Sequence, residues 1–264
     1  MFNTNLFDKE ISTTWLGRDL FFFERLNSTN TFAKNLERDS SKHGTIILAE
    51  NQFKGRGQYK NEWTSDAGAN LTFSLIFEPK SGEKLTVLTL AVSLAIIEII
   101  EEQTKKSLRL KWPNDILYNN SKIAGILTET IFNGNKLDRA IVGVGLNVNQ
   151  ILFEESIHGK ATSIKKIIGK DVIREILLAR ILSRIEYYYQ LWLTTNAELV
   201  KRINKKLIGY GMWIKLLINH QEKEGVFKFL GINEKGQLLV LNKDLEVNIF
   251  SYEQVRIQID SESN

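Results

Sequence analysis

The sequence predicts an α+β protein that ends in a smaller all-β unit. Up to residue 207, segments typical of strands alternate with segments whose apolar residues recur at helical spacing. From Gly211 onward only short strand-like segments remain, separated by Gly, Asn and charged turns. We therefore expect one domain over residues 1–207 and a small barrel or sandwich over residues 208–264.

The elements of the first domain follow from local patterns. Asn27 or Ser28 is suited to cap the first helix at its N-terminus. Pro113 divides one strand-like run, and the turn at 119–121 makes the next run its hairpin partner. We expect strands over 18–26, 44–50, 70–78, 107–112, 115–119, 122–132 and 138–149, and helices after Ser28 and over 84–103, 171–193 and 196–207.

Composition limits the kinds of function. The chain has no cysteine, which excludes disulfides and thiolate metal sites and suits a reducing compartment. Its start lacks the pattern of a signal peptide, and its most apolar stretch, 85–100, is too short for a membrane span. We expect a cytoplasmic protein without membrane contact. The net charge of +4, with acidic residues interspersed, favours a solvated mixed surface over a nucleic-acid interface.

A Gly-rich loop over 52–65 is the first candidate for ligand binding. Gly55 and Gly57 flank Arg56. Glycines let a backbone approach a ligand closely, and an arginine can bind a phosphate or carboxylate with two hydrogen bonds. The loop has neither the P-loop pattern nor the dinucleotide-binding pattern. Taken alone, a surface turn is the simpler interpretation.

Two further stretches carry polar groups, each with a simpler structural explanation. Ser28, Thr29 and Asn30 could bind a polar ligand group, although helix capping needs only one of them. Asn147 ends a buried strand, where an asparagine commonly forms a turn. The histidines are too scattered along the sequence to favour a metal site or a catalytic triad.

The third candidate surrounds one hairpin, where two cations, an amide and a carboxylate come together. Residues two apart along a strand share a face, so we expect Lys122, Ala124 and Ile126 to point the same way. Beside Asp115, Lys122 could neutralise a bound anion. It could equally extend to solvent from a strand end. The four residues of this set are Lys111, Asn114, Asp115 and Lys122.

Together and in this order, these stretches resemble biotin protein ligases, also called holocarboxylase synthetases. The motifs are STN at 28–30, GRGQ at 55–58, KWPND at 111–115 with KIAGIL at 122–127, GVGLNVN at 143–149 and ATSI at 161–164. KWPND with KIAGIL is the most specific, and the resemblance extends from about residue 20 to about residue 260. It implies a mixed-sheet catalytic domain of the class II synthetase-like biotin/lipoate ligase type, followed by an SH3-like β domain.

The resemblance implies a reaction in two steps. Biotin and Mg-ATP give biotinyl-5′-adenylate and pyrophosphate, and a lysine of a biotin carboxyl carrier protein then displaces AMP. ATP and Mg²⁺ are thus the implied cofactors and biotin is the substrate. No dedicated metal site is expected, because Mg²⁺ would arrive with ATP, with Asp115 as its candidate protein ligand.

The resemblance also implies a role for each motif residue. Lys122 would contact the biotin carboxylate and the α-phosphate in both steps, and Asp115 could accept or orient the proton of the attacking amine. The biotin-binding residues would be Ser28, Thr29, Asn30, Gln52, Arg56, Gly57, Gln58, Lys122 and Gly125. The nucleotide-binding residues would be Gly55, Arg56, Trp63, Asn114, Lys122 and Asn147, and the catalytic residues Lys122, Arg56, Asp115 and Lys111.

Two departures from the family pattern stand out. Gln58 and Asn61 occupy positions where many members have arginine, so we expect retention of the adenylate to depend less on charge here. Some members also carry an N-terminal DNA-binding domain. Because the catalytic pattern begins by about residue 20, we expect no such domain and no sequence-specific DNA binding. A weak homodimer is compatible with the sequence.

Three other functions remain as alternatives. A lipoate–protein ligase shares the expected catalytic fold, but GRGQ and KWPND favour biotin. A non-catalytic biotin-sensing module would not need Arg56 and Lys122. A nucleic-acid-binding protein would need a run of basic residues interleaved with aromatic ones, which the sequence lacks.

Overall fold

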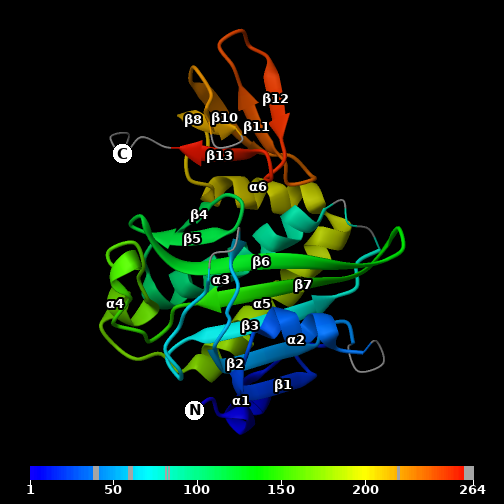
Figure 1. Cartoon of the computed structure of the whole chain (residues 1–264), viewed down its shortest axis with the longest axis vertical. Coiled ribbons are helices and arrows are strands. Elements are labelled where there is room, and N and C mark those ends of the chain that lie inside the picture. The colour runs from blue at the N-terminus through cyan, green and yellow to red at the C-terminus, as the bar shows by residue number, and fades with distance from the viewer. Residues whose placement is uncertain (38–41, 59–61, 81, 83, 219–220, 259–264) are drawn as a thin grey trace.

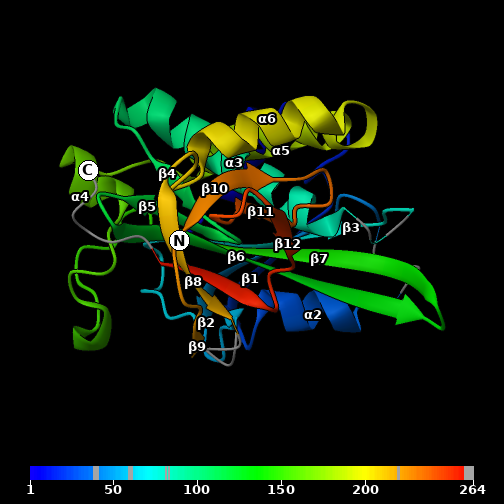
Figure 2. The same cartoon turned by 90° about the horizontal axis from the view of Figure 1, so that it is seen from above.

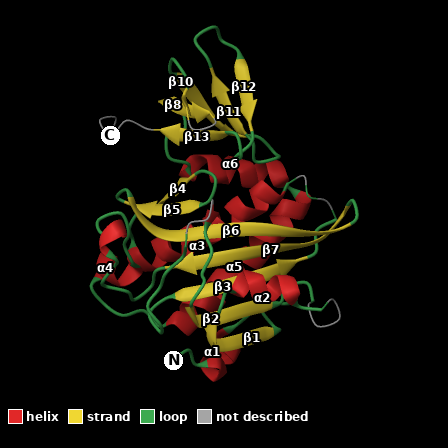
Figure 3. Cartoon of the chain, viewed as in Figure 1, coloured by secondary structure: helices red, strands yellow, loops and turns green. Residues whose placement is uncertain are grey.

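A computed structural model of the chain describes residues 1–37, 42–58, 62–80, 82, 84–218 and 221–258. It has a mixed α+β fold with a large sheet and a smaller C-terminal sheet beyond it (Figures 1 and 3). The helices are α1 (Thr4–Glu10), α2 (Thr29–Asn35), α3 (Leu85–Thr104), α4 (Ile164–Ile168), α5 (Arg174–Thr194) and α6 (Asn196–Lys206), with a short 3₁₀ turn at Glu155–Ile157.

The large sheet has seven strands in the order β1-β2-β3-β7-β6-β5-β4. Only β1 and β2 pair in parallel, and the other pairs are antiparallel, so the sheet is mixed. The strands are β1 (Leu20–Leu26), β2 (Ile46–Gln52), β3 (Leu71–Phe77), β4 (Arg109–Lys111), β5 (Asp115–Tyr118), β6 (Ser121–Asn133) and β7 (Lys136–Leu146).

Helices cover both faces of this sheet (Figure 2). On one side α3 and α5 pack over the main core, and on the other α2 covers a smaller core around Ala33, Ile47 and Ile141. The apolar helix expected over 84–103 is therefore a core helix, and within the described ranges no helix is both long and apolar enough to cross a membrane.

The C-terminal sheet is antiparallel and stands on α6 (Figure 1). Its strands are β8 (Trp213–Ile218), β9 (Gln221–Glu222), β10 (Phe227–Ile232), β11 (Leu238–Leu241), β12 (Val247–Phe250) and β13 (Val255–Gln258), an arrangement consistent with an SH3-like half-barrel. Asn204 of α6 bonds the backbone of Ile232, and the Trp112 indole donates to the Gly236 carbonyl at 3.2 Å. The expected boundary near residue 207 remains our proposal for how the chain divides.

Most expected strands and helices are confirmed within a few residues, and Ser28 is the N-cap of α2. Two helices were missed. The seven-residue α1 and the five-residue α4 are too short for a periodic pattern to reveal them. Their positions depend on tertiary contacts, such as the packing of α1 against α5.

The expectation that Lys122 shares a face with Ala124 and Ile126 is wrong. Leu117 pairs with Lys122 while its neighbour Ile116 pairs with Ala124, so β6 contains a β-bulge at Ile123. Consecutive residues of β5 point to opposite faces, and their partners therefore do so too. Ala124 and Ile126 are buried in the main core, whereas Lys122 points to the other face.

A buried ion pair joins the large sheet to α5. Arg174 donates to both carboxylate oxygens of Glu50, at 2.7 and 2.9 Å, and each side chain is less than a tenth exposed. Burial alone would raise the pKa of Glu50, but the hydrogen bonds and charge of Arg174 hold that pKa below its ordinary value of 4.5. The pair's contribution to stability is therefore complete above the ordinary pKa and is lost as the pH falls through the folded-state pKa.

We predict that Arg174→Met destabilises the protein by about 3–5 kcal/mol at neutral pH, because the Glu50 carboxylate stays buried without its counter-charge. Urea denaturation measures the loss. Arg180→Met is the matched control: its pair with Glu102 is more than 40% exposed, so the loss should be below about 1 kcal/mol. Equal losses in the two variants would contradict the importance of the buried pair.

Candidate active site

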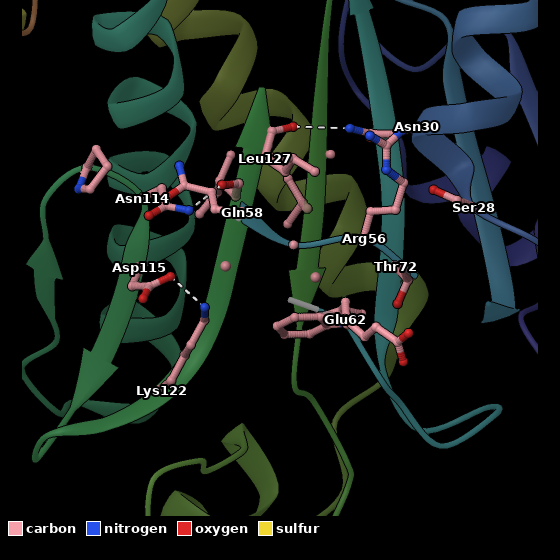
Figure 4. A pocket seen from close by; sticks show the side chains of 18 of the residues that line it. Ser28, Asn30, Arg56, Gln58, Glu62, Thr72, Asn114, Asp115, Lys122 and Leu127 are labelled. Atoms are coloured by element: carbon pink, nitrogen blue, oxygen red, sulfur yellow. Dashed lines mark hydrogen bonds and ion pairs between the residues drawn. The ribbon is translucent and has the colours of Figure 1, made fainter. Parts of the chain in front are cut away.

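A cavity of about 280 Å³ opens on the face of the large sheet that carries α2 (Figure 4). It brings together residues that are far apart in the sequence. The residues predicted from the sequence that line it are Ser28, Thr29, Asn30, Gln52, Arg56, Gly57, Gln58, Trp63, Lys111, Asn114, Asp115, Lys122 and Gly125.

The floor of this pocket consists largely of glycine. Gly125 of β6 pairs with Gly145 of β7, and Gly143 lies two residues away on the same face. A Cβ on Gly143 would lie 2.2 Å from the Asn30 amide oxygen, and one on Gly145 would lie 2.2 Å from the Trp63 ring. The glycines therefore leave the space that these two side chains occupy.

One end of the pocket is lined by hydroxyl and amide groups. The Gln52 side-chain oxygen accepts from the Thr29 backbone N–H at 2.7 Å, and the Thr29 hydroxyl lies 3.0 Å from the same oxygen. The Ser74 hydroxyl donates to the Asn30 oxygen at 2.6 Å. Thr29, Asn30 and Ser74 are almost completely buried, so their orientations are fixed by these hydrogen bonds.

Glu129 connects this polar end to the Gly-rich loop. Its carboxylate accepts from the Asn30 amide at 2.9 Å and from Lys34 at 2.6 Å, and it lies 3.0 Å from the Arg56 guanidinium. Burial would raise the pKa of Glu129, but the hydrogen bonds from Lys34 and Asn30, with the charges of Lys34 and Arg56, lower it below its ordinary value. An ionised Glu129 therefore holds Arg56 at the pocket.

At the other end, Lys122 forms an ion pair with Asp115, with 2.5 Å between the ammonium nitrogen and a carboxylate oxygen (Figure 4). The Lys122 side chain is 36% exposed, so the pair is weak and a more highly charged anion can compete for the lysine. A Cβ on Gly125 would lie 2.9 Å from the end of the Lys122 side chain, so this glycine too makes room for a neighbour.

The peptide groups of Lys122 are fixed by the segment that contains ATSI. The Lys122 N–H donates to the Lys160 carbonyl at 2.8 Å, and its carbonyl accepts from Thr162 at 2.9 Å. Asn147 in turn donates from its side chain to the Thr162 carbonyl and from its backbone to the Ile123 carbonyl. These bonds hold the bulged start of β6 in place.

Two predicted residues do not line the cavity. Asn147 instead holds the backbone around Lys122, as described above. Gly55 lies so close to the Trp63 backbone that a Cβ on it would be 2.1 Å from the Trp63 carbonyl oxygen. Their assignment to nucleotide binding stays a prediction. Asn61 falls outside the described residues, while Gln58 lies on the pocket wall.

The sequence interpretation missed three charged residues. Glu62, near the end of the Gly-rich loop, lines the pocket. Glu129 follows Gly125 and Leu127 at alternate positions of β6, so its spacing could have placed it on the pocket face. Arg256 reaches the pocket from β13 of the C-terminal sheet, and its guanidinium donates to the Val255 carbonyl at 2.7 Å. Nothing in the local pattern around Arg256 indicated this approach.

Among the described residues, no group of three or more His, Cys, Asp and Glu side chains is arranged to hold a metal ion. The pocket nevertheless contains the Asp115 carboxylate beside the Asn114 amide. Mg²⁺ is commonly bound by one or two carboxylates together with substrate phosphates and water. The donors present therefore fit a magnesium ion that arrives with a nucleotide.

The fold and the pocket fit an α+β ligase, and comparisons with known proteins agree. The Biotin/lipoate A/B protein ligase family matches residues 22–147. The bifunctional ligase/repressor BirA of Bacillus subtilis is 31% identical over 91% of this chain and 75% of its own. A biotin protein ligase structure from Aquifex aeolicus in complex with biotin and ATP is 31% identical, with a TM-score of 0.78 over 91% of this chain and 99% of that one. The chain belongs to the biotin/lipoate protein ligase family.

We predict that Gly143→Ala lowers the free energy of unfolding by about 1–3 kcal/mol, because its methyl group overlaps the Asn30 amide. Urea denaturation tests this. Gly82→Ala is the control, since its nearest neighbours lie 3.8 Å away, and it should change stability by less than about 0.5 kcal/mol. An unchanged Gly143→Ala variant would mean that Asn30 can leave its position without cost.

Proposed function

We propose that the protein is an ATP-dependent biotin protein ligase, a biotin–[biotin carboxyl carrier protein] ligase. It converts biotin to biotinyl-5′-AMP and transfers the biotinyl group to a lysine of a biotin carboxyl carrier protein. The observation that carries this proposal is one pocket with hydroxyl and amide groups at one end and the cation of Lys122 at the other. Biotin has the matching polarity, with a ureido ring at one end and a carboxylate at the other.

The polar end suits the ureido ring, which offers one carbonyl acceptor and two N–H donors. Ser28, Thr29 and Asn30 supply hydroxyl and amide partners, with Gln52 beside them. Lipoate, the substrate of the second candidate function, has a dithiolane ring without hydrogen-bonding N–H groups. It would make none of the additional hydrogen bonds that a ureido ring can make with these groups, which disfavours its binding.

In the first step, a carboxylate oxygen of biotin attacks the α-phosphorus of ATP, and the bond to pyrophosphate breaks. Negative charge accumulates where the two anions meet, so cations aimed at that point stabilise the transition state. Lys122 and Arg56 are the residues we assign to this role, and Lys111 is a further cation of the pocket. Each of the first two would exchange a carboxylate partner, Asp115 or Glu129, for ligand oxygens.

In the second step, the neutral amine of the acceptor lysine attacks the acyl carbonyl. A C–N bond forms, the amine nitrogen loses a proton, and AMP leaves with the electron pair of the broken C–O bond. Asp115 is the candidate to accept or orient that proton. Lys122 would again neutralise the phosphate, because the same phosphate is the leaving group.

Mg²⁺ bound with ATP would neutralise phosphate charge and orient the leaving pyrophosphate. Asp115 and Asn114 are the residues that would hold it together with the phosphates, and they lie on the wall next to Lys122. Lys122 would then turn from Asp115 toward the α-phosphate.

Incubation with ATP, Mg²⁺, biotin and a biotin carboxyl carrier domain tests the proposal. We expect one acceptor lysine to gain the mass of a biotinyl group, with biotin but not lipoate raising the melting temperature of the ligase. Biotin-dependent ATP–pyrophosphate exchange distinguishes an enzyme from a non-catalytic biotin sensor. The proposed function would be refuted if the acceptor lysine gained no mass although a known ligase modifies the same acceptor.

We predict that Lys122→Ala slows both half-reactions by about 10²–10³-fold, because each passes through the same phosphate. Pyrophosphate exchange reports the first half-reaction, and single-turnover transfer from added biotinyl-AMP reports the second. The fold should persist, since the Lys122–Asp115 pair is partly exposed and the main-chain bonds of Lys122 do not use its side chain. Unfolding of the variant at the assay temperature would instead assign Lys122 a structural role.

A further inference from the structure

Glu129 of β6 uses its two carboxylate oxygens on different parts of the pocket. One oxygen lies 2.6 Å from the Lys34 ammonium and 3.0 Å from the Arg56 guanidinium. The other accepts a hydrogen bond from the Asn30 amide at 2.9 Å. The Glu129 side chain is only 13% exposed, so both sets of contacts lie largely away from solvent. A change at this carboxylate therefore affects the polar end and the Gly-rich loop together.

The bond to Glu129 fixes which way the Asn30 amide points. The amide NH2 group faces the Glu129 carboxylate at 2.9 Å and the Leu127 carbonyl at 3.3 Å (Figure 4). An ionised carboxylate and a carbonyl are acceptors only, so turning the amide over would place its oxygen against two other oxygens. The Ser74 hydroxyl fits either orientation, because it can donate to an amide oxygen or accept from an amide nitrogen. Glu129 and Leu127 therefore decide the orientation.

In this orientation the Asn30 amide is an acceptor for a ligand. An amide has two N–H donors and an oxygen that can accept two bonds. Glu129 and Leu127 take both donors, whereas the oxygen accepts one bond from the described residues, that of Ser74. Asn30 lines the pocket, and its oxygen is the Asn30 atom nearest to the position that a Cβ on Gly143 of the floor would take. The oxygen thus borders the space assigned to the ring of biotin.

We propose that Glu129 is a positioning residue that determines specificity: it turns the Asn30 amide so that the oxygen, and not the NH2 group, meets an N–H of the ureido ring. This inference rests on the proposed ligase function. A ligand with an acceptor at that place would bring two oxygens together and leave a buried polar group without its hydrogen bond. Through Asn30, the carboxylate therefore selects an acid substrate whose ring donates hydrogen bonds.

Two cyclic carbamate analogues of biotin test this selection in the unmodified protein. In each analogue one ring N–H is replaced by an oxygen, so a donor becomes an acceptor while the size of the ring hardly changes. We expect the isomer that places its oxygen at Asn30 to bind about 10- to 100-fold more weakly than biotin. Calorimetric titration without ATP measures both affinities. Equal affinities for biotin and both isomers would overturn the proposal.

Glu129→Gln connects this selection to the carboxylate. Lys34 and Arg56 bond an amide oxygen more strongly than Asn30 does, because their hydrogen bonds are charge-assisted. The new amide therefore directs its oxygen to the two cations and its NH2 group to Asn30. The Asn30 amide then turns over, gives up its longer bond to Leu127 and presents its nitrogen to the ring. We expect discrimination against that carbamate to fall below about threefold or to reverse.

Lys34→Met is the matched control. It removes one positive partner of Glu129 but leaves the bonds to Asn30 and Arg56, so discrimination should remain as in the unmodified protein. A ratio of two affinities cancels general damage to the pocket, because such damage weakens both ligands alike. The proposal would be wrong if Glu129→Gln discriminated like the unmodified protein, or if Lys34→Met lost discrimination to the same extent.

If Glu129→Gln alone proves too unstable to assay, the double variant with Lys34→Met takes its place, since it restores the balance of charge. The same loss of discrimination is expected there, because Arg56 still draws the new amide oxygen. Retained discrimination in the double variant would contradict the proposal.

Binding and activation of biotin keep this inference distinct from the proposed function. If the unmodified protein formed biotinyl-AMP but bound both carbamates as tightly as biotin, the role of Glu129 alone would be refuted. If it neither bound biotin nor catalysed biotin-dependent pyrophosphate exchange, the ligase function itself would be contradicted.

Discussion

The glycine floor formed by β6 and β7 is the constraint on which the rest of the site depends. Gly125, Gly143 and Gly145 lie on one face, at the centre of an otherwise well-packed sheet. Because these glycines have no side chains, the side chains of Asn30, Trp63 and Lys122 can lie directly against the backbone of β6 and β7. A larger residue at any of these positions would occupy the space that is now taken by Asn30, by Trp63 of the Gly-rich loop or by Lys122.

Charge is divided over the site so that each reactive cation has a carboxylate partner. Lys122 pairs with Asp115, and Arg56 pairs with Glu129. Both cations remain at least a third exposed, so the pairs hold them in position at little energetic cost. Phosphates carry more charge than a single carboxylate and can displace either partner. Lys122 and Arg56 are therefore already positioned for a bound anion, which would replace their carboxylate partners.

The two sheets are connected at the place where this chemistry is proposed. Trp112 precedes Pro113 in the KWPND motif and bonds the Gly236 turn of the C-terminal sheet, while Arg256 of that sheet lines the pocket. The C-terminal sheet thus forms part of the wall of the active-site pocket.

The sequence by itself predicted most of the strands and the longer helices, a cap of α2 at Asn27 or Ser28, and most of the polar and cationic residues that the structure gathers in one pocket. These depend on local rules, namely the periodicity of apolar residues, turn residues and capping, together with motifs of fixed spacing. Only the tertiary structure decided which face Lys122 takes, because the bulge at Ile123 arises from the pairing of β5 with β6. It also decided that Glu129 holds Arg56 and that Arg256 reaches the pocket, since those contacts join residues distant in sequence.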